Sequence, residues 1–295
     1  MIKNNKYMEL YEMLMAKSHD DILEIVSRVK SGYAVVNGSK WTLFIPEQVT
    51  CDVIPMMVSH TDTVSNKKPK KFKSFGNVVT NPDGVLGADD RAGCYGLYKM
   101  MEANVQAFYL FTDEEEIGGV GASEFAMSDT WEEIQESVSG LVELDRRGSS
   151  DVATYGYDNS EFVKLFERHG YKEANGSYTD VVSLSEKSTL ACVNLSIGYY
   201  DEHSQSERLN IAEMQDTIDL MVTLEEQIPA LYENRYESET EHHSRWALWE
   251  DDIEDEGAIL CDVCESHKPL FDTTNGYLCK DCIDTYGKEE LWEGY

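Results

Sequence analysis

Apolar residues recur along the first 50 positions with two different periods. Residues 5–16 and residues 20–30 place them every three or four positions, which predicts two short amphipathic helices. Residues 33–45 (YAVVNGSKWTLFI) instead contain two β-prone runs on either side of Asn37 and Gly38, a dipeptide typical of a two-residue hairpin turn. We therefore expect a pair of helices followed by a β-hairpin.

Three later segments are apolar almost without interruption, as strands buried on both faces of a sheet are. They are residues 53–60 (VIPMMVSH), 107–112 (AFYLFT) and 141–145 (LVELD). Helical patterns at residues 92–103 and 124–136 separate them. Strands that alternate with helices predict an α/β fold, in which a mostly parallel mixed sheet is flanked by helices on both faces.

The same alternation continues through the next eighty residues. Residues 161–171 (EFVKLFERHGY) predict a helix that ends near Gly170, and residues 191–200 (ACVNLSIGYY) predict a further strand. Residues 211–227 predict a long helix that closes the unit.

The composition divides the chain into three parts. Residues 1–228 are expected to form the α/β domain, residues 229–257 an acidic linker or extension, and residues 258–295 a small module with four cysteines. Between Glu233 and Glu256, ten acidic residues stand against two arginines, which is typical of a solvated segment.

Charge and cysteine usage exclude several classes of protein. The chain has 25 basic and 56 acidic residues, a net charge of −31, and would repel both a phosphate backbone and an anionic membrane surface. We therefore expect neither nucleic acid nor a membrane as partner, and the sequence contains no signal-peptide or membrane-span pattern. Cys51, Cys94 and Cys192 stand singly among apolar neighbours, as buried free thiols do, and a reducing, cytoplasmic location is expected.

Side chains that suit a metal ion follow the ends of the predicted strands, where α/β folds collect their chemistry. In chain order they are His60, Asp62, Asp89, Glu114, Glu115, Glu116, Asp145 and His203. A single one has an ordinary explanation, such as a helix cap at Asp89, but capping does not account for five such segments. Asp62 stands two residues after His60, so it can accept a hydrogen bond from one imidazole nitrogen while the other nitrogen binds metal.

Five blocks of sequence, in this order, resemble the co-catalytic dizinc exopeptidases. The blocks are VSHTDTV, GVLGADDRAG, FTDEEEIGGVGA, VELD and NLSIGYYDEHSQSE, which span roughly residues 50–227. That superfamily includes peptidase T, carboxypeptidase G, aminoacylase and the single-domain zinc aminopeptidases. The resemblance implies a zinc-exopeptidase fold and the hydrolysis of a peptide bond.

The resemblance also implies a role for each matched residue. Asp89 would bridge two zinc ions, for which manganese and cobalt are alternatives. His60 and Asp145 would complete one metal site, and Glu116 and His203 would complete the other. The remaining roles are those of Glu115 as general base, Asp62 as the residue that orients His60, and Glu114 as a dispensable acid. A zinc-bound hydroxide would attack the scissile carbonyl, while Glu115 would pass a proton to the departing amine.

One element of the family is missing. Many relatives insert a lid or dimerisation domain before the final histidine, whereas here 57 residues separate Asp145 from His203. Because the single-domain aminopeptidases work without a lid, the resemblance favours an aminopeptidase or a di- or tripeptidase over a carboxypeptidase or aminoacylase. Tyr178-Thr179-Asp180 resembles a Thr/Ser-Asp step that the family carries before its last strand, and has either a structural or substrate-side role or the role of a helix cap. Arg91 either pairs with acids near Asp89 or lies on the helix surface.

The C-terminal cysteines form a second candidate metal site. Cys261 and Cys264 are separated by fourteen residues from Cys279 and Cys282. Two C-x2-C pairs at this spacing predict one structural zinc in a zinc-ribbon-like module, with a redox or disulfide pair as the alternative. Because acids outnumber its lysines, we expect the module to bind a protein partner rather than nucleic acid.

Three classes of function remain. The favoured class is a dizinc aminopeptidase or di- or tripeptidase that acts on a peptide substrate. The second is an amidohydrolase or deacylase that acts on another small amide, and the third is a non-catalytic acidic adaptor. The sequence is compatible with an oligomer and does not indicate its size.

Overall fold

The computed structural model describes residues 6–29, 32–65, 67–155, 159–188, 190–224 and 228, and the backbone of residues 270–273 and 276–279. The chain divides into two compact units, Met1–Glu239 and Thr240–Tyr295.

The first unit starts with the two predicted helices, α1 (Met8–Met15) and α2 (His19–Val26). Ser18 caps α2, because its hydroxyl accepts a hydrogen bond from the backbone N–H of Asp21 at 3.2 Å. The prediction of a helix pair is confirmed.

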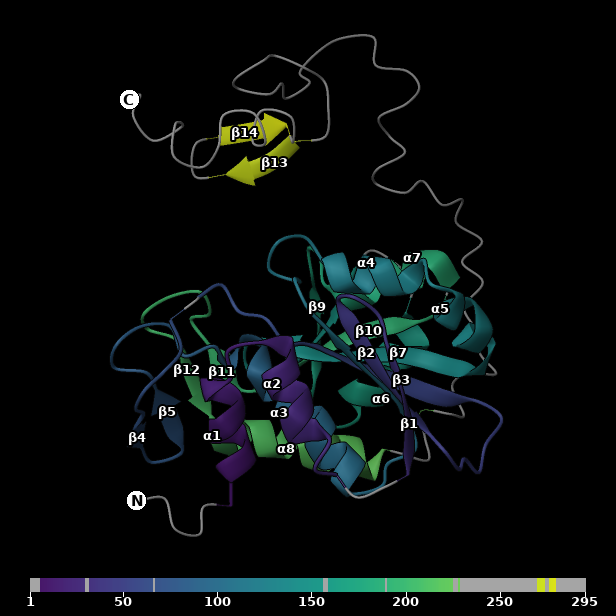
Figure 1. Ribbon diagram of the computed structural model, residues 1–295, viewed down its shortest axis with the longest axis horizontal. Coiled ribbons are helices and arrows are strands. Elements are labelled where there is room, and N and C mark those ends of the chain that lie inside the picture. Colours follow the sequence, from purple (N-terminus) through teal and green to yellow (C-terminus); the bar gives the residue numbers. More distant parts are fainter. Residues whose placement is uncertain are drawn as a thin grey trace. The chain divides into compact units, whose positions relative to one another are not determined.

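In the described part of the chain, eight strands form the central sheet, in the order β1-β2-β6-β3-β7-β10-β8-β9 (Figure 1). The strands are β1 (Tyr33–Asn37), β2 (Trp41–Pro46), β3 (Ile54–His60), β6 (Phe108–Thr112), β7 (Val138–Arg146), β8 (Asp151–Thr154), β9 (Lys172–Asn175) and β10 (Cys192–Ser196). The pairs β3–β6, β3–β7, β7–β10 and β8–β9 are parallel, whereas β1–β2, β2–β6 and β8–β10 are antiparallel. The predicted hairpin and the mostly parallel mixed sheet are confirmed.

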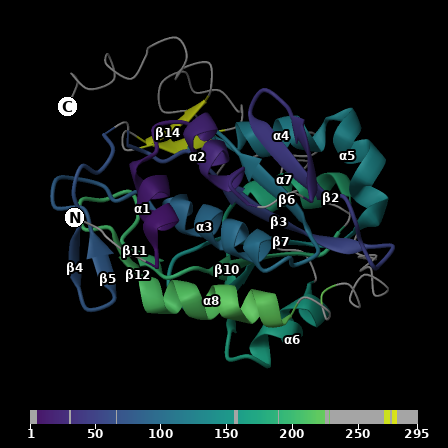
Figure 2. The ribbon, with the colours of Figure 1, turned by 60° about the horizontal axis from the view of Figure 1, so that its bottom comes forward.

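Helices cover both faces of this sheet. Apolar side chains of α1, α2, α3 (Ala88–Glu102), α6 (Ser160–Glu167) and α8 (Ile211–Thr223) belong to one core. Those of α4 (Val120–Ala126), α5 (Asp129–Ile134) and α7 (Asp180–Ser188) belong to the other. In Figure 2, α3 and α8 lie beside each other on their face of the sheet.

Strand β3 shows why a strand in a sheet that is covered on both faces has a continuous apolar sequence. Met57 lies in the core beneath α3, whereas Met56 and Val58 lie in the opposite core. All seven residues of β3 are buried, so both alternating faces of the strand require apolar side chains.

Two predicted elements are interrupted. The helix expected at residues 124–136 is α4, then α5 and a short 3-10 turn (Gln135–Ser137), because Ser128 accepts a hydrogen bond from the N–H of Trp131 and so begins a new helix. The strand expected at residues 191–200 is β10 and the two-residue β11 (Tyr199–Tyr200), because Gly198 turns the chain with φ of +86°.

A smaller sheet contains β11 together with three other short strands, in the order β11-β12-β5-β4. These are β4 (Lys73–Phe75), β5 (Val78–Thr80) and β12 (Arg208–Asn210). The pairing of β12 with β5 brings the segment after His203 alongside the segment before Asp89.

Two expectations about single residues are wrong. Cys51 is exposed, whereas Cys94 and Cys192 are buried as expected. Arg91 neither pairs with acids nor lies on the surface: it is fully buried and donates hydrogen bonds to the backbone oxygens of Thr61 and Met13, at 2.6 and 2.7 Å. It thereby joins the end of α1 to the end of β3.

In the second unit the described residues form one antiparallel hairpin, β13 (Leu270–Thr273) and β14 (Gly276–Cys279). Cys279 ends β14, and the other three predicted zinc ligands of the module lie outside the described residues. None of the helices that the structure describes is both long enough and apolar enough to cross a membrane.

Candidate metal centre

The predicted metal ligands gather where the parallel strands β3, β6 and β7 reach their carboxyl ends, as expected for an α/β sheet. His60 is the last residue of β3, Glu115 and Glu116 follow β6, and Asp145 lies near the end of β7. Asp89 comes from the start of α3 and His203 from the loop after β11. Residues that lie up to 143 positions apart in the sequence thus share one edge of the sheet.

Each carboxylate oxygen of Asp89 faces a different histidine. Oδ1 lies 3.2 Å from Nε2 of His60, and Oδ2 lies 3.1 Å from Nε2 of His203. Asp145 is on the first side, with Oδ1 3.7 Å from Nε2 of His60, and Glu116 is on the second, with Oε2 3.0 Å from Nε2 of His203. The five side chains therefore form two groups that share Asp89.

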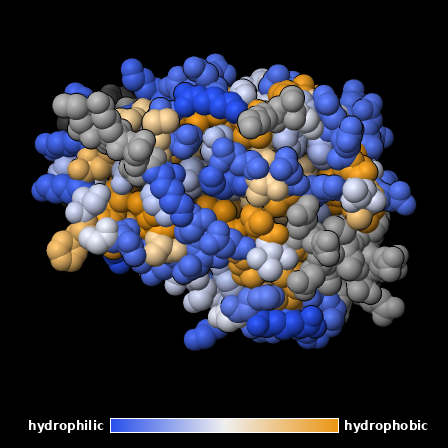
Figure 3. Space-filling model, turned by 90° about the horizontal axis from the view of Figure 1, so that it is seen from below, coloured by the Kyte–Doolittle hydropathy of each residue, from blue (hydrophilic) through white to orange (hydrophobic). Residues whose placement is uncertain are grey.

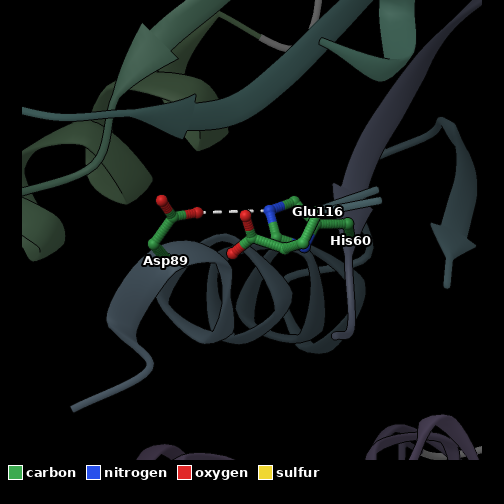
Figure 4. A group of neighbouring side chains, drawn as sticks. All are labelled: His60, Asp89 and Glu116. Carbon is green, nitrogen blue, oxygen red and sulfur yellow. Dashed lines mark hydrogen bonds and ion pairs between the residues drawn. The ribbon is translucent and has the colours of Figure 1, made fainter. Parts of the chain in front are cut away.

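Figure 4 shows how three of these side chains point toward one another. One donor atom from each of His60, Asp89 and Glu116 lies within 4.8 Å of the others. His60 is almost fully buried, whereas the side chain of His203 is 49% exposed. One side of the cluster is thus enclosed by the fold and the other faces solvent.

Asp62 fixes the orientation of His60 and also holds the loop after β6. Its Oδ1 lies 3.2 Å from Nδ1 of His60, so the opposite ring nitrogen points to Asp89. The backbone N–H groups of Glu115 and Glu116 donate to the two oxygens of Asp62 at 3.1 and 3.2 Å. Burial opposes the ionisation of Asp62, but the hydrogen bond and charge of His60 outweigh it, and the pKa of Asp62 lies below its usual value.

Asp145 is held by three residues, of which the sequence indicates only Thr179. The hydroxyl of Tyr199 donates to Oδ1 at 3.0 Å, and the hydroxyl of Thr179 lies 3.2 Å from Oδ2. The side chain of Asn194 bonds both the N–H and the carbonyl of Asp145, each at 2.8 Å. The sequence around Tyr199 and Asn194 predicts a strand and does not indicate these contacts. Thr179 belongs to the Thr179-Asp180 step, for which a structural role is one of the expectations.

The neighbouring acids Asp90 and Glu114 are directed elsewhere. Asp90 accepts a hydrogen bond from the N–H of Gly93 at 3.0 Å and thus caps α3. Glu114 forms an ion pair with Lys40. Of the two adjacent aspartates only Asp89 faces the histidines, and among the three glutamates Glu114 points away from them.

The cluster carries an excess of buried negative groups. Burial, together with the charges of Asp145, Asp180 and Glu116, raises the pKa of Glu115 to about 8. Hydrogen bonds to Asp89 and Glu116 raise the pKa of His203 to about 11. These shifts show that the carboxylates strongly favour a positive charge between them.

The donors present fit divalent metal ions. Glu116 Oε1 is buried and has no hydrogen-bond partner among the described residues, so it has a lone pair free for a ligand. Each of the two groups around Asp89 offers one imidazole nitrogen and two carboxylate oxygens. Three protein ligands of these types are typical of a catalytic zinc, which keeps a further position for water.

The sequence matches no protein-family model and no curated protein. Its structure, however, resembles those of several peptidases. Aminopeptidase PepT from Bacillus cereus superposes with a TM-score of 0.57 at 16% identity, over 76% of this chain and 97% of that one. The TET aminopeptidase of a marine sediment thaumarchaeon gives 0.58 at 14% identity, over 79% and 100%. The TET1 peptidase of Pyrococcus horikoshii gives 0.51 at 13% identity, over 71% and 94%.

These similarities establish the fold. The described α/β unit shares its fold with these peptidases. The aligned region covers nearly the whole length of each of these peptidases.

Proposed function

We propose that this chain is a dizinc exopeptidase, and specifically an aminopeptidase or a di- or tripeptidase. The observation that carries the proposal is the position of Asp89, whose two oxygens face two separate histidines at 3.2 and 3.1 Å. The names of the neighbours, an aminopeptidase PepT and a TET aminopeptidase, support the same activity.

Each of the two groups of side chains would bind one metal ion. His60, Asp145 and one oxygen of Asp89 would hold the first ion. Glu116, His203 and the other oxygen of Asp89 would hold the second. When bound, a pair of zinc ions makes water more acidic and offsets negative charge that develops on a carbonyl oxygen.

Glu115 is the residue proposed to move the proton. Its Oε2 lies 4.0 Å from Nε2 of His60, beside the ligands, and its side chain is largely buried. Burial and the surrounding acids raise the pKa of Glu115 to about 8, so this carboxyl group can exchange protons near neutral pH. Oε2 of Glu115 would accept a proton from the attacking water and then deliver it to the departing amine. The hydrogen bond from the N–H of Glu115 to Asp62, which also contacts His60, holds the main chain of Glu115 close to His60.

The absence of a lid within the described residues supports a small-peptide substrate. Between Asp145 and His203 the described residues form β8, α6, β9, α7, β10 and β11, all of them parts of the α/β unit. An exopeptidase without a lid would take its substrate directly at the exposed side of the centre, where His203 lies.

The proposal is tested by replacing the proposed base. Zinc-loaded protein is assayed on aminoacyl p-nitroanilides, di- and tripeptides, and N-acyl amino acids. Glu115→Gln is expected to lower kcat for the preferred peptide by about 10²- to 10⁴-fold, the usual contribution of a general base. The matched control is Glu114→Gln, which changes the adjacent glutamate that pairs with Lys40 and should change kcat less than threefold, on the order of a lost surface ion pair.

Each alternative gives a different result in the same assay. Hydrolysis of N-acyl amino acids without hydrolysis of peptides would indicate a deacylase. No hydrolysis of any substrate by zinc-loaded protein would indicate the non-catalytic adaptor. Unchanged activity in Glu115→Gln would remove Glu115 from the mechanism.

We also propose that Cys261, Cys264, Cys279 and Cys282 bind one structural zinc in the module at residues 258–295. The spacing of the cysteines carries this proposal. The acidic segment, residues 229–257, would then link the module to the catalytic domain, residues 1–228. The module is proposed to bind a protein partner.

A further inference from the structure

Glu207 is a buried carboxylate whose two oxygens accept four consecutive backbone hydrogen bonds. Its Oε2 accepts from the N–H groups of Leu86 and Gly87 at 2.9 and 2.8 Å. Its Oε1 accepts from those of Ala88 and Asp89 at 2.7 and 3.1 Å. Glu207 is only 1% exposed, so water cannot replace these contacts.

The four N–H groups belong to the turn that carries Asp89 into α3. N–H groups at the start of a helix have no partner within the helix and must find another acceptor. Here the backbone departs from helical geometry, with φ of +73° at Gly87 and ψ of 107° at Asp89. The path of this turn is therefore fixed by the Glu207 carboxylate rather than by the helix itself.

Glu207 also lies on the same segment as His203, four residues later in the chain. His203 faces Oδ2 of Asp89, while Glu207 bonds the backbone N–H of Asp89. The segment 203–207 thus contacts Asp89 at both its side chain and its main chain. The pairing of β12 with β5 anchors this segment immediately beyond Glu207.

We propose that Glu207 is a positioning residue for the metal centre. By holding the main chain of Asp89, it sets the distance between the carboxylate of Asp89 and the imidazole of His203, and with it the spacing of the donors around the second ion. The inference rests on the metal centre proposed above.

Replacing Glu207 by glutamine tests the inference. The amide keeps the shape of the side chain, but its NH₂ group would face two backbone N–H donors and its remaining oxygen could accept from only two of the four. Metal-free protein is titrated with Mn²⁺ and the free ion is followed by electron paramagnetic resonance. Manganese is the suitable probe because it prefers imidazole and carboxylate ligands to the thiolates of the C-terminal module.

Glu207→Gln is expected to bind Mn²⁺ about 10- to 100-fold more weakly than the unchanged protein, as is usual when a residue supporting a metal ligand is lost. Excess metal should restore kcat on peptides with KM unchanged. The matched control is Glu202→Gln in the same loop, which removes the same charge but only an ion pair with Arg147, and should bind Mn²⁺ normally.

Two results would overturn the inference. One is Mn²⁺ affinity in Glu207→Gln within twofold of the unchanged protein. The other is loss of the far-UV circular dichroism in both Glu207→Gln and Glu207→Asp without metal, which would make Glu207 a requirement of the fold rather than of the centre. Because the titration needs no substrate, a protein that binds Mn²⁺ as expected but cleaves no peptide would contradict the proposed function alone.

Discussion

Asp89 differs from every other acid in the cluster, because both of its oxygens face a histidine. The pKa of Asp89 lies far below its usual range, since the hydrogen bonds from His203 and His60 outweigh the burial that opposes ionisation. An ionised, buried carboxylate that lies between two imidazoles is well placed to bind two cations at once, one through each oxygen.

Removing Asp89 should therefore affect both ions, whereas removing a ligand on one side should affect mainly one. Asp89→Ala is expected to lose both metals of the centre, and His203→Ala is expected to lose chiefly one. Metal content after dialysis, measured by inductively coupled plasma mass spectrometry, distinguishes the two. Equal retention by both variants would contradict the sharing of Asp89.

Metal binding should also release protons. Without metal, the hydrogen bonds to Asp89 and Glu116 raise the pKa of His203 to about 11, so this imidazole is protonated at pH 7. Because the ion must displace that proton, affinity is expected to rise with pH up to the pKa of His203, by about tenfold per pH unit for each proton released.

Calorimetric titration with Mn²⁺ in two buffers of different ionisation enthalpy counts these protons. At least one is expected at pH 7 in the unchanged protein, and fewer are expected in His203→Ala. Heats that do not depend on the buffer would contradict the prediction.

Some of the residue-level geometry can be predicted from the sequence. The contact between His60 and Asp62 follows from their two-residue spacing at the end of a strand, since such positions face the same way. The contacts of Tyr199 and Asn194 with Asp145 join positions at least 49 residues apart, and no local pattern carries them.

At the scale of elements, the position of Asp89 relative to Asp145 depends on how closely α3 approaches β7. Gly93 of α3 lies against this strand, and a Cβ at this position would be 2.4 Å from the backbone oxygen of Leu144 and 2.3 Å from the Asp90 carboxylate. Because a backbone atom cannot move aside as a side chain can, the helix itself would have to shift.

Gly93→Ala is therefore expected to destabilise the metal-free protein by about 1–3 kcal/mol, the usual cost of overpacking a core. Gly96, one turn later, is the control, because the one close contact of its added methyl would be with the flexible Leu144 Cδ1, at 2.9 Å, while Ile218 Cγ1 and Ile197 Cδ1 would lie at ordinary van der Waals distances of 3.6 and 3.9 Å. The higher helix propensity of alanine offsets much of that contact. Urea denaturation of both variants measures the difference, and equal stability would show that α3 can move freely over β7.

The sequence predicts the elements better than their ends. The buried strands β3, β6 and β7 are recognisable because both of their faces are covered, so their apolar runs are continuous. The break between α4 and α5 depends on a single hydroxyl, that of Ser128, and the end of β10 depends on the turn at Gly198. The sequence pattern marks neither position, because the helical period continues across Ser128 and the apolar run continues across Gly198.

At the scale of the whole molecule, the net charge of −31 would repel anionic partners and attract cationic ones. On the face shown in Figure 3, hydrophilic side chains cover much of the surface, and hydrophobic ones show in groups between them.

The whole chain should contain about three zinc ions, from the two metals of the centre and the one structural zinc proposed for the four cysteines. Mild chelation should remove two of them, and a thiol-modifying reagent should then release the third. Cys264→Ser should lose only the third and leave peptide hydrolysis by the first unit intact. Loss of all zinc to the mild chelator would contradict a thiolate site.

Anomalous diffraction at the zinc edge, from crystals grown with zinc, tests the central claim most directly. We expect two peaks about 3.5–4 Å apart, the spacing of two-metal hydrolase sites, with one oxygen of Asp89 toward each. A single peak among these residues, or two peaks with no Asp89 oxygen toward one of them, would contradict the account.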